Sequence, residues 1–417
     1  MLDPLVDASP WLLLASGAAF FLLMANALWP LRHPLLMFQS FLAGLTVRET
    51  AAHHLAWQVP FVGLLVVAGA LREWLGIVGL VLVGLSWVGL VGLFVVAHRD
   101  AARVRAQGDP GQEPAPSYPV AYLAAPPLAF LRRDISVQRG IVFGEAEGVR
   151  LRLDVFRPRA QGRLRPAVVQ VHGGGWVSGF KRAQGVPLLG QLASLGWVGF
   201  NIDYRLGPRA AFPAHLVDVK RAVAWVREHA EEHGVDPSFI VITGGSAGGH
   251  LVALAGLTAN DPEYQPGFET ADTSVAAVAA FYGMYDLTER RRPLGRIVRA
   301  FLERWVLKKR YDEDPEAFVR ASPIERVHPD APPFYVVHGT ADTIIPVAGA
   351  RAFVARLREV SRAPVYYLEV PGAGHAFDIL PSLRTGATVE VITAKLVALH
   401  REHARRQQTE TSPSATA

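Results

Sequence analysis

The chain has 417 residues, which is room for one large domain and a second region. It contains no cysteine, so disulfides, thiolate catalysis and cysteine-ligated metal centres are excluded. The formal net charge is only +5, and no basic and aromatic pattern typical of nucleic-acid binding is present. Anionic lipid is therefore a better candidate partner for the positive charge than nucleic acid.

Half of the residues are hydrophobic, and the excess lies at the N-terminus. Residues 11–29 and 74–97 are uncharged runs long enough to cross a bilayer, and residues 55–71 form a third apolar run. Residues 35–47 are too short to span comfortably and are expected to be an interfacial or re-entrant piece. We therefore predict a transmembrane helical region over residues 1–100, with three or four helices.

The arginines of this region predict its orientation. With three spans, only Arg72 falls on one side, and the positive-inside rule then places the C-terminal domain in the cytoplasm of a multi-pass protein, for which we expect the plasma membrane. If residues 35–47 also span, an arrangement with the N-terminus inside keeps the domain inside. A cleaved signal peptide is the alternative for the first run, but Asp3 and Asp7 stand where its basic residues would be. The arginines on the cytoplasmic side would be Arg32, Arg48, Arg99, Arg103 and Arg105.

The rest of the chain divides by composition. Residues 101–135 are rich in proline and predict a linker, and the polar residues 404–417 predict a disordered tail. Between them, residues 136–403 alternate strand and helix patterns, which favours an α/β fold with a mostly parallel sheet covered on both faces. Strands are expected at 149–156, 167–171, 197–202, 240–243, 275–282, 334–337 and 365–370, and helices at 216–229, 347–360 and 388–403.

A glycine-rich turn around Ser246 is the most informative motif. The strand pattern of residues 240–243 is followed by Gly244-x-Ser246-x-Gly248 and then by a helical pattern, which is typical of a nucleophile elbow. The glycines are required because side chains there would collide with the adjoining strand and helix. The alternative is a glycine-rich loop that only turns the chain or holds a phosphate.

An acid and a base follow later strands. Asp342 lies after the strand at 334–337 and His375 after the strand at 365–370, and parallel strands bring such ends to one edge of the sheet. Taken singly, Asp342 could be a loop-capping residue and His375 a surface histidine. Together with Ser246 they stand in the order serine, aspartate, histidine, so we predict a catalytic triad.

A run of three glycines in His172–Trp176 follows the strand at 167–171. Such a loop lets backbone amides approach the oxyanion of a tetrahedral intermediate, whereas an ordinary turn has no need of three consecutive glycines.

In these motifs the chain resembles the α/β-hydrolase fold and, within it, the hormone-sensitive-lipase-like carboxylesterases, over residues 136–403. The resemblance implies that the amides of Gly174, Gly175 and Ala247 form the oxyanion hole. It implies a structural role for Asp203-Tyr204-Arg205, with an Asp–Arg pair bracing the loops. The motifs that carry it are His172-Gly-Gly-Gly-Trp176, Asp203-Tyr204-Arg205, Gly244-Gly-Ser-Ala-Gly-Gly249, His338-Gly-Thr-Ala-Asp342 and Gly374-His375-Ala376.

The N-terminal runs are similar to those of membrane-anchored members, such as actinobacterial Lip-type carboxylesterases and prenylcysteine methylesterases. Much of the family is instead soluble and carries an N-terminal helical cap. Here apolar runs stand in that place, so what is known of the acyl pocket in soluble members does not transfer directly.

Residues 288–314 form a basic insertion before the strand of the acid. Its apolar residues recur at helical spacing, which suggests a lid that lies on an anionic membrane. The alternative is a solvated helix whose apolar stripe packs on the domain. The stripe comprises Ile297, Val298, Phe301, Leu302, Trp305 and Val306, and the basic residues are Arg290, Arg291, Arg292, Arg296, Arg299, Arg304, Lys308, Lys309 and Arg310.

These patterns predict a serine carboxylic-ester hydrolase that acts through an acyl-enzyme on lipophilic acyl esters. Acyl transfer to an alcohol with the same triad, and a prenylcysteine-methylesterase-like activity, are alternatives; a non-catalytic scaffold would have no need of the intact triad. No metal or organic cofactor is required. The expected partners are a small-molecule or lipid ester and membrane lipids, and the oligomeric state is open.

Overall fold

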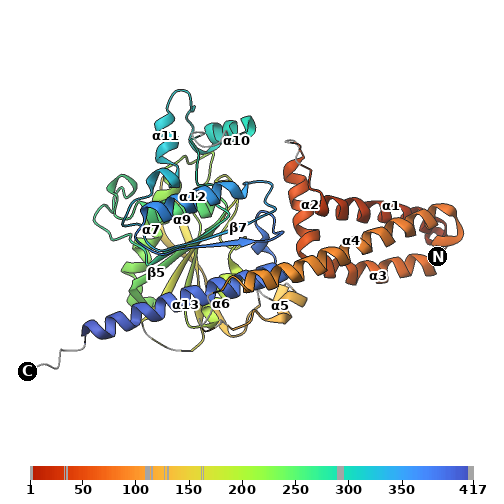
Figure 1. The fold of residues 1–417 in the computed structure, drawn as a ribbon, viewed down its shortest axis with the longest axis horizontal. Helices are drawn as coiled ribbons and strands as arrows, with labels where there is room; N and C mark the ends of the chain where they lie inside the picture. The colour runs from red at the N-terminus through yellow and green to blue at the C-terminus, as the bar shows by residue number, and fades with distance from the viewer. Residues whose placement is uncertain are drawn as a thin grey trace, which may run out of the picture.

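The computed structural model consists of an N-terminal helical bundle and an α/β domain, with the C-terminal helix running along one face of the sheet (Figure 1). The carboxyl ends of the parallel strands point toward the bundle (Figure 1). The structure describes residues 3–31, 33, 36–108, 113, 116–125, 127–128, 131–160, 162, 164–288 and 295–411.

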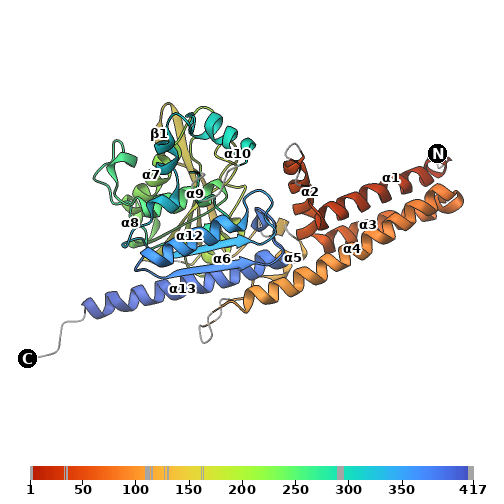
Figure 2. The same ribbon diagram turned by 45° about the horizontal axis from the view of Figure 1, so that its top comes forward.

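Four helices make up the bundle. Helices α1, α3 and α4 lie side by side, and α2 stands across the end of the bundle that faces the domain (Figures 1 and 2). Helices α1 and α4 approach closely at small residues: a Cβ atom on Gly79 would lie 2.6 Å from the backbone of Leu13. The bounds are α1 Asp3–Leu28, α2 Met37–Glu49, α3 Ala51–Val67 and α4 Trp74–Arg105, with the short turn η1 Ala70–Arg72 between the last two.

Two of these helices, α1 over Asp7–Leu28 and α4, are long and apolar enough to cross a bilayer. Helices α2 and α3 are bent by 84° at their junction and pass the same test only as a pair. The expectation that residues 35–47 form a piece too short to span agrees with the 13 residues of α2. The three longer predicted runs are helical.

The domain is built on one eight-stranded sheet in the order β1-β2-β4-β3-β5-β6-β7-β8. The pairs β1–β2 and β2–β4 are antiparallel, and all others are parallel, as the sequence predicted. The N-terminal strand β1 was not predicted. The bounds are β1 Ile135–Ala146, β2 Val149–Pro158, β3 Arg165–Val171, β4 Val198–Ile202, β5 Val235–Gly245, β6 Ala277–Phe281, β7 Phe334–Gly339 and β8 Val365–Val370.

Helices cover both faces of this sheet (Figure 1). Helices α6 Val186–Ser194 and α13 Leu383–Thr411 lie on one face, and α7 Ala214–Glu228, α9 Ala247–Leu257 and α12 Val347–Val360 lie on the other. Along β5, Ile240 and Ile242 belong to one hydrophobic core and Val241 to the other. Burial on both faces explains why this strand is a continuous apolar run. The shorter elements are α5 Val120–Ala124, α8 Ala230–His233, η3 Pro262–Tyr264, α10 Arg296–Phe301, the π-helix η4 Leu302–Val306, α11 Pro315–Arg320, η5 Pro323–Arg326 and η6 Phe377–Ile379.

Two predicted boundaries are wrong. The helical region was predicted to end at residue 100, but helix α4 continues to Arg105, because Ala101 and Val104 are buried in the hydrophobic core that α13 covers. Helix α13 continues to Thr411, where a disordered tail from residue 404 was predicted; an ion pair between Arg406 and Glu402 one turn apart supports these last turns. Residues 412–417 lie outside the described residues.

Candidate active site

Ser246 occupies a strained turn between β5 and α9. Its backbone has φ 58° and ψ −120°, and its amide donates to the carbonyl of Phe281 over 3.0 Å. The flanking glycines leave no room for side chains, since a Cβ on Gly248 would lie 2.2 Å and one on Gly244 2.7 Å from the carbonyl oxygen of Val171. The local geometry is that of the predicted elbow, with the side chain held at the carboxyl edge of the sheet.

Two loops bring the base and the acid to this serine. Nε2 of His375 lies 2.8 Å from Oγ of Ser246, and Nδ1 of His375 lies 2.7 Å from Oδ2 of Asp342. The other carboxylate oxygen of Asp342 accepts hydrogen bonds from the amides of Ile344 and Ile345, over 2.9 and 2.8 Å. The structure thus places the three residues in one hydrogen-bonded row.

Asp342 is held as a carboxylate although it is buried. Burial opposes its ionisation, but the charge of His375 and hydrogen bonds from His338 and His375 outweigh that effect and hold the pKa of Asp342 well below its usual range. The sequence assigned no role to His338, although it belongs to the motif that ends in Asp342. Its Nε2 lies 3.3 Å from Oδ2 of Asp342 and 2.8 Å from the carbonyl of Ile345. A charged acid is what an imidazolium partner requires.

The three-glycine loop lies against the serine. A Cβ on Gly173 would be 3.0 Å from Cβ of Ser246, so the loop approaches as closely as a backbone can. Gly174 has φ 119° and Gly175 φ 60°, values that favour glycine. Ala247 is the first residue of α9, where amides have no partner within the helix. Gly173 and Ala247 thus lie next to Ser246, and the oxyanion hole formed by Gly174, Gly175 and Ala247 stays a prediction.

Neighbouring side chains brace this loop. The hydroxyl of Tyr204 donates to the carbonyl of His172 over 3.1 Å, and the two rings stack with centroids 4.4 Å apart. Nε1 of Trp176 donates to Nδ1 of His250 over 3.2 Å, while Nε2 of His250 lies 2.7 Å from the carbonyl of Ala321. Burial lowers the pKa of His250 to about 4, so this ring is neutral and can accept from Trp176.

The expected Asp–Arg pair within Asp203-Tyr204-Arg205 is wrong. Arg205 instead binds Asp218, with Nη2 2.8 Å from Oδ1, and Asp203 pairs with Lys181. Both residues lie in the loop that follows β4, and each finds its partner on another segment: Lys181 for Asp203 and Asp218 of α7 for Arg205. The motif still braces the loops, through Tyr204 and through these two separate pairs.

The basic insertion is packed on the domain over its described part. Leu302 and Val306 are buried, and Phe301 and Trp305 pack against the same core, whereas Ile297 is 52% exposed. The structure thus favours the packed helix over the membrane lid. The ring of Phe301 borders the glycine loop, because a Cβ on Gly175 would lie 3.4 Å from its Cζ. Residues 289–294, with three of the predicted basic residues, lie outside the described residues.

Acidic neighbours also offset the charge of this insertion. Arg299 pairs with Glu303 over 2.9 Å and with Asp312 over 2.6 Å, and Lys309 pairs with Asp314 over 2.6 Å. A run of arginine and lysine therefore overstates the positive potential that a membrane would meet.

Two aromatic rings contact His375, and the sequence identified neither as part of the site. The ring centroid of Tyr282 lies 5.0 Å and that of Phe41 5.8 Å from the imidazole, both edge to face. Tyr282 follows β6, and its position at a strand end was the only available signal. Phe41 belongs to α2, and no local pattern in residues 35–47 indicated a contact with the domain. Within the described part of the chain, no group of three or more histidine, aspartate or glutamate side chains could hold a metal ion.

Comparisons with known proteins find that this chain is similar to esterases. The BD-FAE family model matches residues 153–357. Esterase LipQ of Mycobacterium tuberculosis is 49% identical over 58% of this chain and 58% of its own length, and the probable carboxylic ester hydrolase LipM of the same organism is 46% identical over 65% and 64%. Isoprenylcysteine alpha-carbonyl methylesterase ICME of Arabidopsis thaliana is 29% identical over 54% and 53%.

Solved structures agree with these relatives. A truncated carbohydrate esterase from gut microbiota is 25% identical with a TM-score of 0.56, covering 65% of this chain and 99% of that one. The butyrate-bound esterase Est2 of Thermogutta terrifontis is 29% identical with a TM-score of 0.55, covering 64% and 95%. The match to the curated relatives spans only 53–64% of their length.

Proposed function

We propose that this chain, whose domain has the α/β-hydrolase fold and is related to the Lip esterases, is a serine hydrolase of carboxylic esters anchored in a membrane. One observation carries the proposal: Ser246, His375 and Asp342 form a continuous hydrogen-bonded row beside the three-glycine loop, with separations of 2.8 and 2.7 Å. The named relatives and structural neighbours are esterases, which supports the reaction class.

The proposed mechanism follows from the atoms in this row. Oγ of Ser246 attacks the ester carbonyl while Nε2 of His375 accepts its proton, and Asp342 stabilises the resulting imidazolium. The amides of Gly174, Gly175 and Ala247 stabilise the oxyanion, and His375 then passes the proton to the leaving alcohol. A water molecule, deprotonated by His375, finally hydrolyses the acyl group from Ser246.

The bundle supports a membrane location with the domain on the cytoplasmic side. Arg48, Arg103 and Arg105 lie at the end of α2 or α4 next to the domain, and Arg72 lies in the turn η1 at the other end (Figure 1). With α1, α3 and α4 as spans, the positive-inside rule assigns the domain side to the cytoplasm. A site beside such a bundle suits esters that partition into the bilayer.

The decisive experiment is hydrolysis of p-nitrophenyl esters from acetate to palmitate by the full chain in detergent micelles. Ser246→Ala should lower kcat by something on the order of a millionfold, as removal of a triad serine does elsewhere. Residual turnover within tenfold of wild type would contradict the assignment of Ser246. Turnover that appears only when an alcohol acceptor is added would favour acyl transfer instead.

A second candidate is hydrolysis of the methyl ester of a prenylated cysteine, which the similarity to the plant methylesterase favours. It uses the same row of residues and differs only in the ester. Farnesylcysteine methyl ester added to the same assay distinguishes the two: a kcat/KM far above that of every p-nitrophenyl ester would select this substrate.

A further inference from the structure

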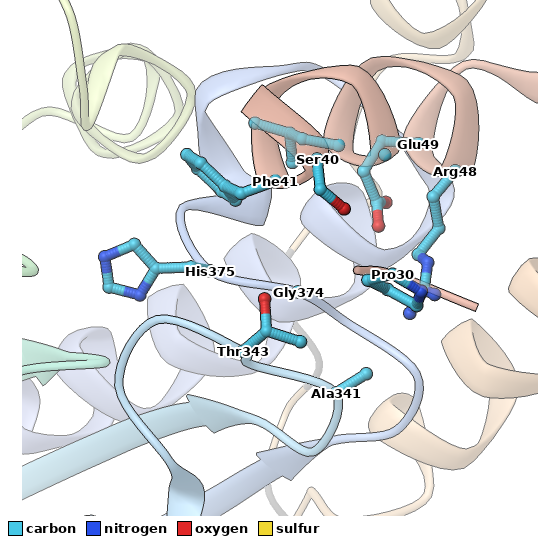
Figure 3. A pocket seen from close by; sticks show the side chains of 11 residues that line it. Pro30, Ser40, Phe41, Arg48, Glu49, Ala341, Thr343, Gly374 and His375 are labelled. Carbon is cyan, nitrogen blue, oxygen red and sulfur yellow. The ribbon is translucent and has the colours of Figure 1, made fainter. Parts of the chain in front are cut away.

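Helix α2 is packed against the loop that carries His375. The rings of Phe41 and His375 meet edge to face with centroids 5.8 Å apart, and Phe41 and Leu45 pack against the core beneath α13. The gap left between α2 and the loop is about 20 Å³, room for about one water molecule. Figure 3 shows Phe41 and His375 next to each other at this gap, with Thr343 on the opposite loop.

Polar contacts hold α2 in this place. Nη1 of Arg48 donates to the carbonyl of Gly372 over 2.9 Å, and Nε of the buried Arg384 donates to the carbonyl of Pro371 over 3.1 Å. Arg384 also joins the two regions, with its Nη1 3.3 Å from Oε1 of Glu49 and its Nη2 2.7 Å from Oδ2 of Asp100. Both acceptor carbonyls belong to the loop that ends in His375. The bundle is thus attached to the loop of the proposed base itself.

The chemistry of ester cleavage says which part of a substrate this wall would meet. To receive its proton, the leaving alcohol oxygen has to lie within hydrogen-bond reach of Nε2 of His375. The carbonyl oxygen lies instead toward the glycine loop, where the ring of Phe301 borders Gly175. Two rings contact the imidazole, but Tyr282 is fully buried in the domain, which leaves Phe41 of the bundle to flank the alcohol side of the ester.

An apolar surface leads along α2 to this point. Phe38, which is 61% exposed, contacts the ring of Phe41 with centroids 6.0 Å apart, and Leu42 is 46% exposed on the same helix. Helix α2 crosses the end of the bundle that faces the domain (Figure 2). A lipid-dissolved molecule that leaves the bilayer on this side would therefore pass α2 on its way to His375.

We infer that Phe41 is a substrate-contacting residue, and that α2 forms the wall that binds the alcohol portion of an ester with a long apolar alcohol taken up from the membrane. This inference rests on the proposed esterase function. It makes the bundle a part of the binding site as well as an anchor.

The test compares two ester series with the full chain in mixed micelles. The alcohol series comprises the acetates of ethyl, hexyl and dodecyl alcohol, and the acyl series comprises the ethyl esters of acetic, hexanoic and dodecanoic acid. Phe41→Ala should lower the kcat/KM ratio of dodecyl acetate to ethyl acetate about tenfold, mainly through KM, because one large ring contact is lost. The corresponding ratio in the acyl series should change by less than about twofold. Phe41→Leu should restore part of the preference.

Phe61→Ala is the matched control. Phe61 is also an aromatic residue of the bundle, but its ring contacts are with Phe20 and Trp57 in α1 and α3. It should leave both ratios as in wild type. Thermal unfolding and the rate at which a small fluorophosphonate labels Ser246 report whether each variant is folded with a reactive serine.

Each remaining outcome overturns the inference. An equal loss on both series, with a lower unfolding temperature, would mean that Phe41 only packs α2 against the domain. A selective loss in the acyl series would assign this wall to the acyl group. If folded wild type is labelled at Ser246 but hydrolyses neither series, the proposed ester hydrolysis fails, and this inference fails with it.

Discussion

Two helices each place an aromatic ring beside a different part of the proposed active site. Phe301 of α10 borders the glycine loop near Gly175, and Phe41 of α2 contacts His375. The sequence pointed to α10 as the membrane-facing element, because its apolar residues recur at helical spacing among basic ones. The structure packs that stripe onto the domain and leaves α2, a helix with no evident pattern, next to the proposed base.

The difference shows what periodicity can and cannot tell. An apolar stripe at helical spacing indicates that one face of a helix is shielded from water, but it does not say whether lipid or protein shields that face. For this stripe the domain provides the cover, since Leu302 and Val306 of the π-helix η4, which continues α10, are buried. In α2 the contact depends on a bend of 84° between α2 and α3, which turns α2 toward the domain.

The largest effect is expected from a substitution in the triad, which leaves both α2 and α10 unchanged. Asp342→Asn should lower kcat about 10⁴-fold on all esters alike, because an amide favours the wrong tautomer of His375. The measurement is kcat across the p-nitrophenyl series, with the unfolding temperature as control. This uniform loss is the reference for the selective losses expected at α2. A loss of less than tenfold would remove Asp342 from the mechanism.

The next effect tests how firmly α2 is attached. Arg384 is 1% exposed and pairs with two carboxylates of the bundle, Glu49 and Asp100. Arg384→Gln removes the buried cation and leaves Glu49 with the hydroxyl of Ser382 and Asp100 with the exposed Arg103. It should lower the free energy of unfolding by about 3–5 kcal/mol in denaturant titrations.

Arg401→Gln in the same helix is the control. Its side chain is 51% exposed and pairs with the exposed Glu113, so the expected change is within about 0.5 kcal/mol. Equal, small effects of both substitutions would mean that the ion pairs of Arg384 contribute little to joining the bundle and the domain.

The third prediction concerns the other ring on the imidazole, Tyr282, whose hydroxyl donates to Asp378. Burial raises the pKa of Asp378 to about 6, although the hydrogen bond from Tyr282 opposes the rise. The folded state therefore holds this proton more tightly than the unfolded chain. The contribution to stability is complete below pH about 4 and is lost as the pH rises to about 6, by at most about 1.4 kcal/mol per pH unit.

Asp378→Asn keeps an acceptor for Tyr282 and removes the titration. The free energy of unfolding of this variant, minus that of wild type, should therefore rise between pH 4 and pH 7. Denaturant titrations at each pH measure both values. A difference that does not depend on pH would show that Asp378 has an ordinary pKa in the folded state.

The smallest effect is expected at α10. Phe301→Ala should lower kcat/KM by about tenfold or less, on short and long p-nitrophenyl esters alike, because it loosens the glycine loop without opening a lid. Ile297→Ala, at an exposed position of the same helix, should have no effect. A loss confined to long-chain esters would restore the lid hypothesis. Helix α10 would then contact the substrate, as we infer for α2.

Much of the domain could be predicted because its signals are local. The apolar run before Ser246 predicts a strand, the glycines predict a turn, and the order serine, aspartate, histidine at the ends of three parallel strands predicts their meeting. The structure brings Ser246, His375 and Asp342 together as that order indicates. The partners of Arg205 could not be predicted in the same way, since Asp218 lies on α7 and only the packing of that helix brings it near.

The sequence by itself determined the apolar helices, the alternating α/β pattern and the residues proposed for catalysis, because each is encoded within a few turns or at the end of a strand. Only the tertiary structure decided which apolar face meets which. Arg48 and Gly372 are 324 residues apart, and nothing near either residue in the chain marks the other as its partner. Packing joins them because Phe41 and Leu45 of α2 pack against the hydrophobic core that α13 also covers, and this brings α2 next to the loop of His375.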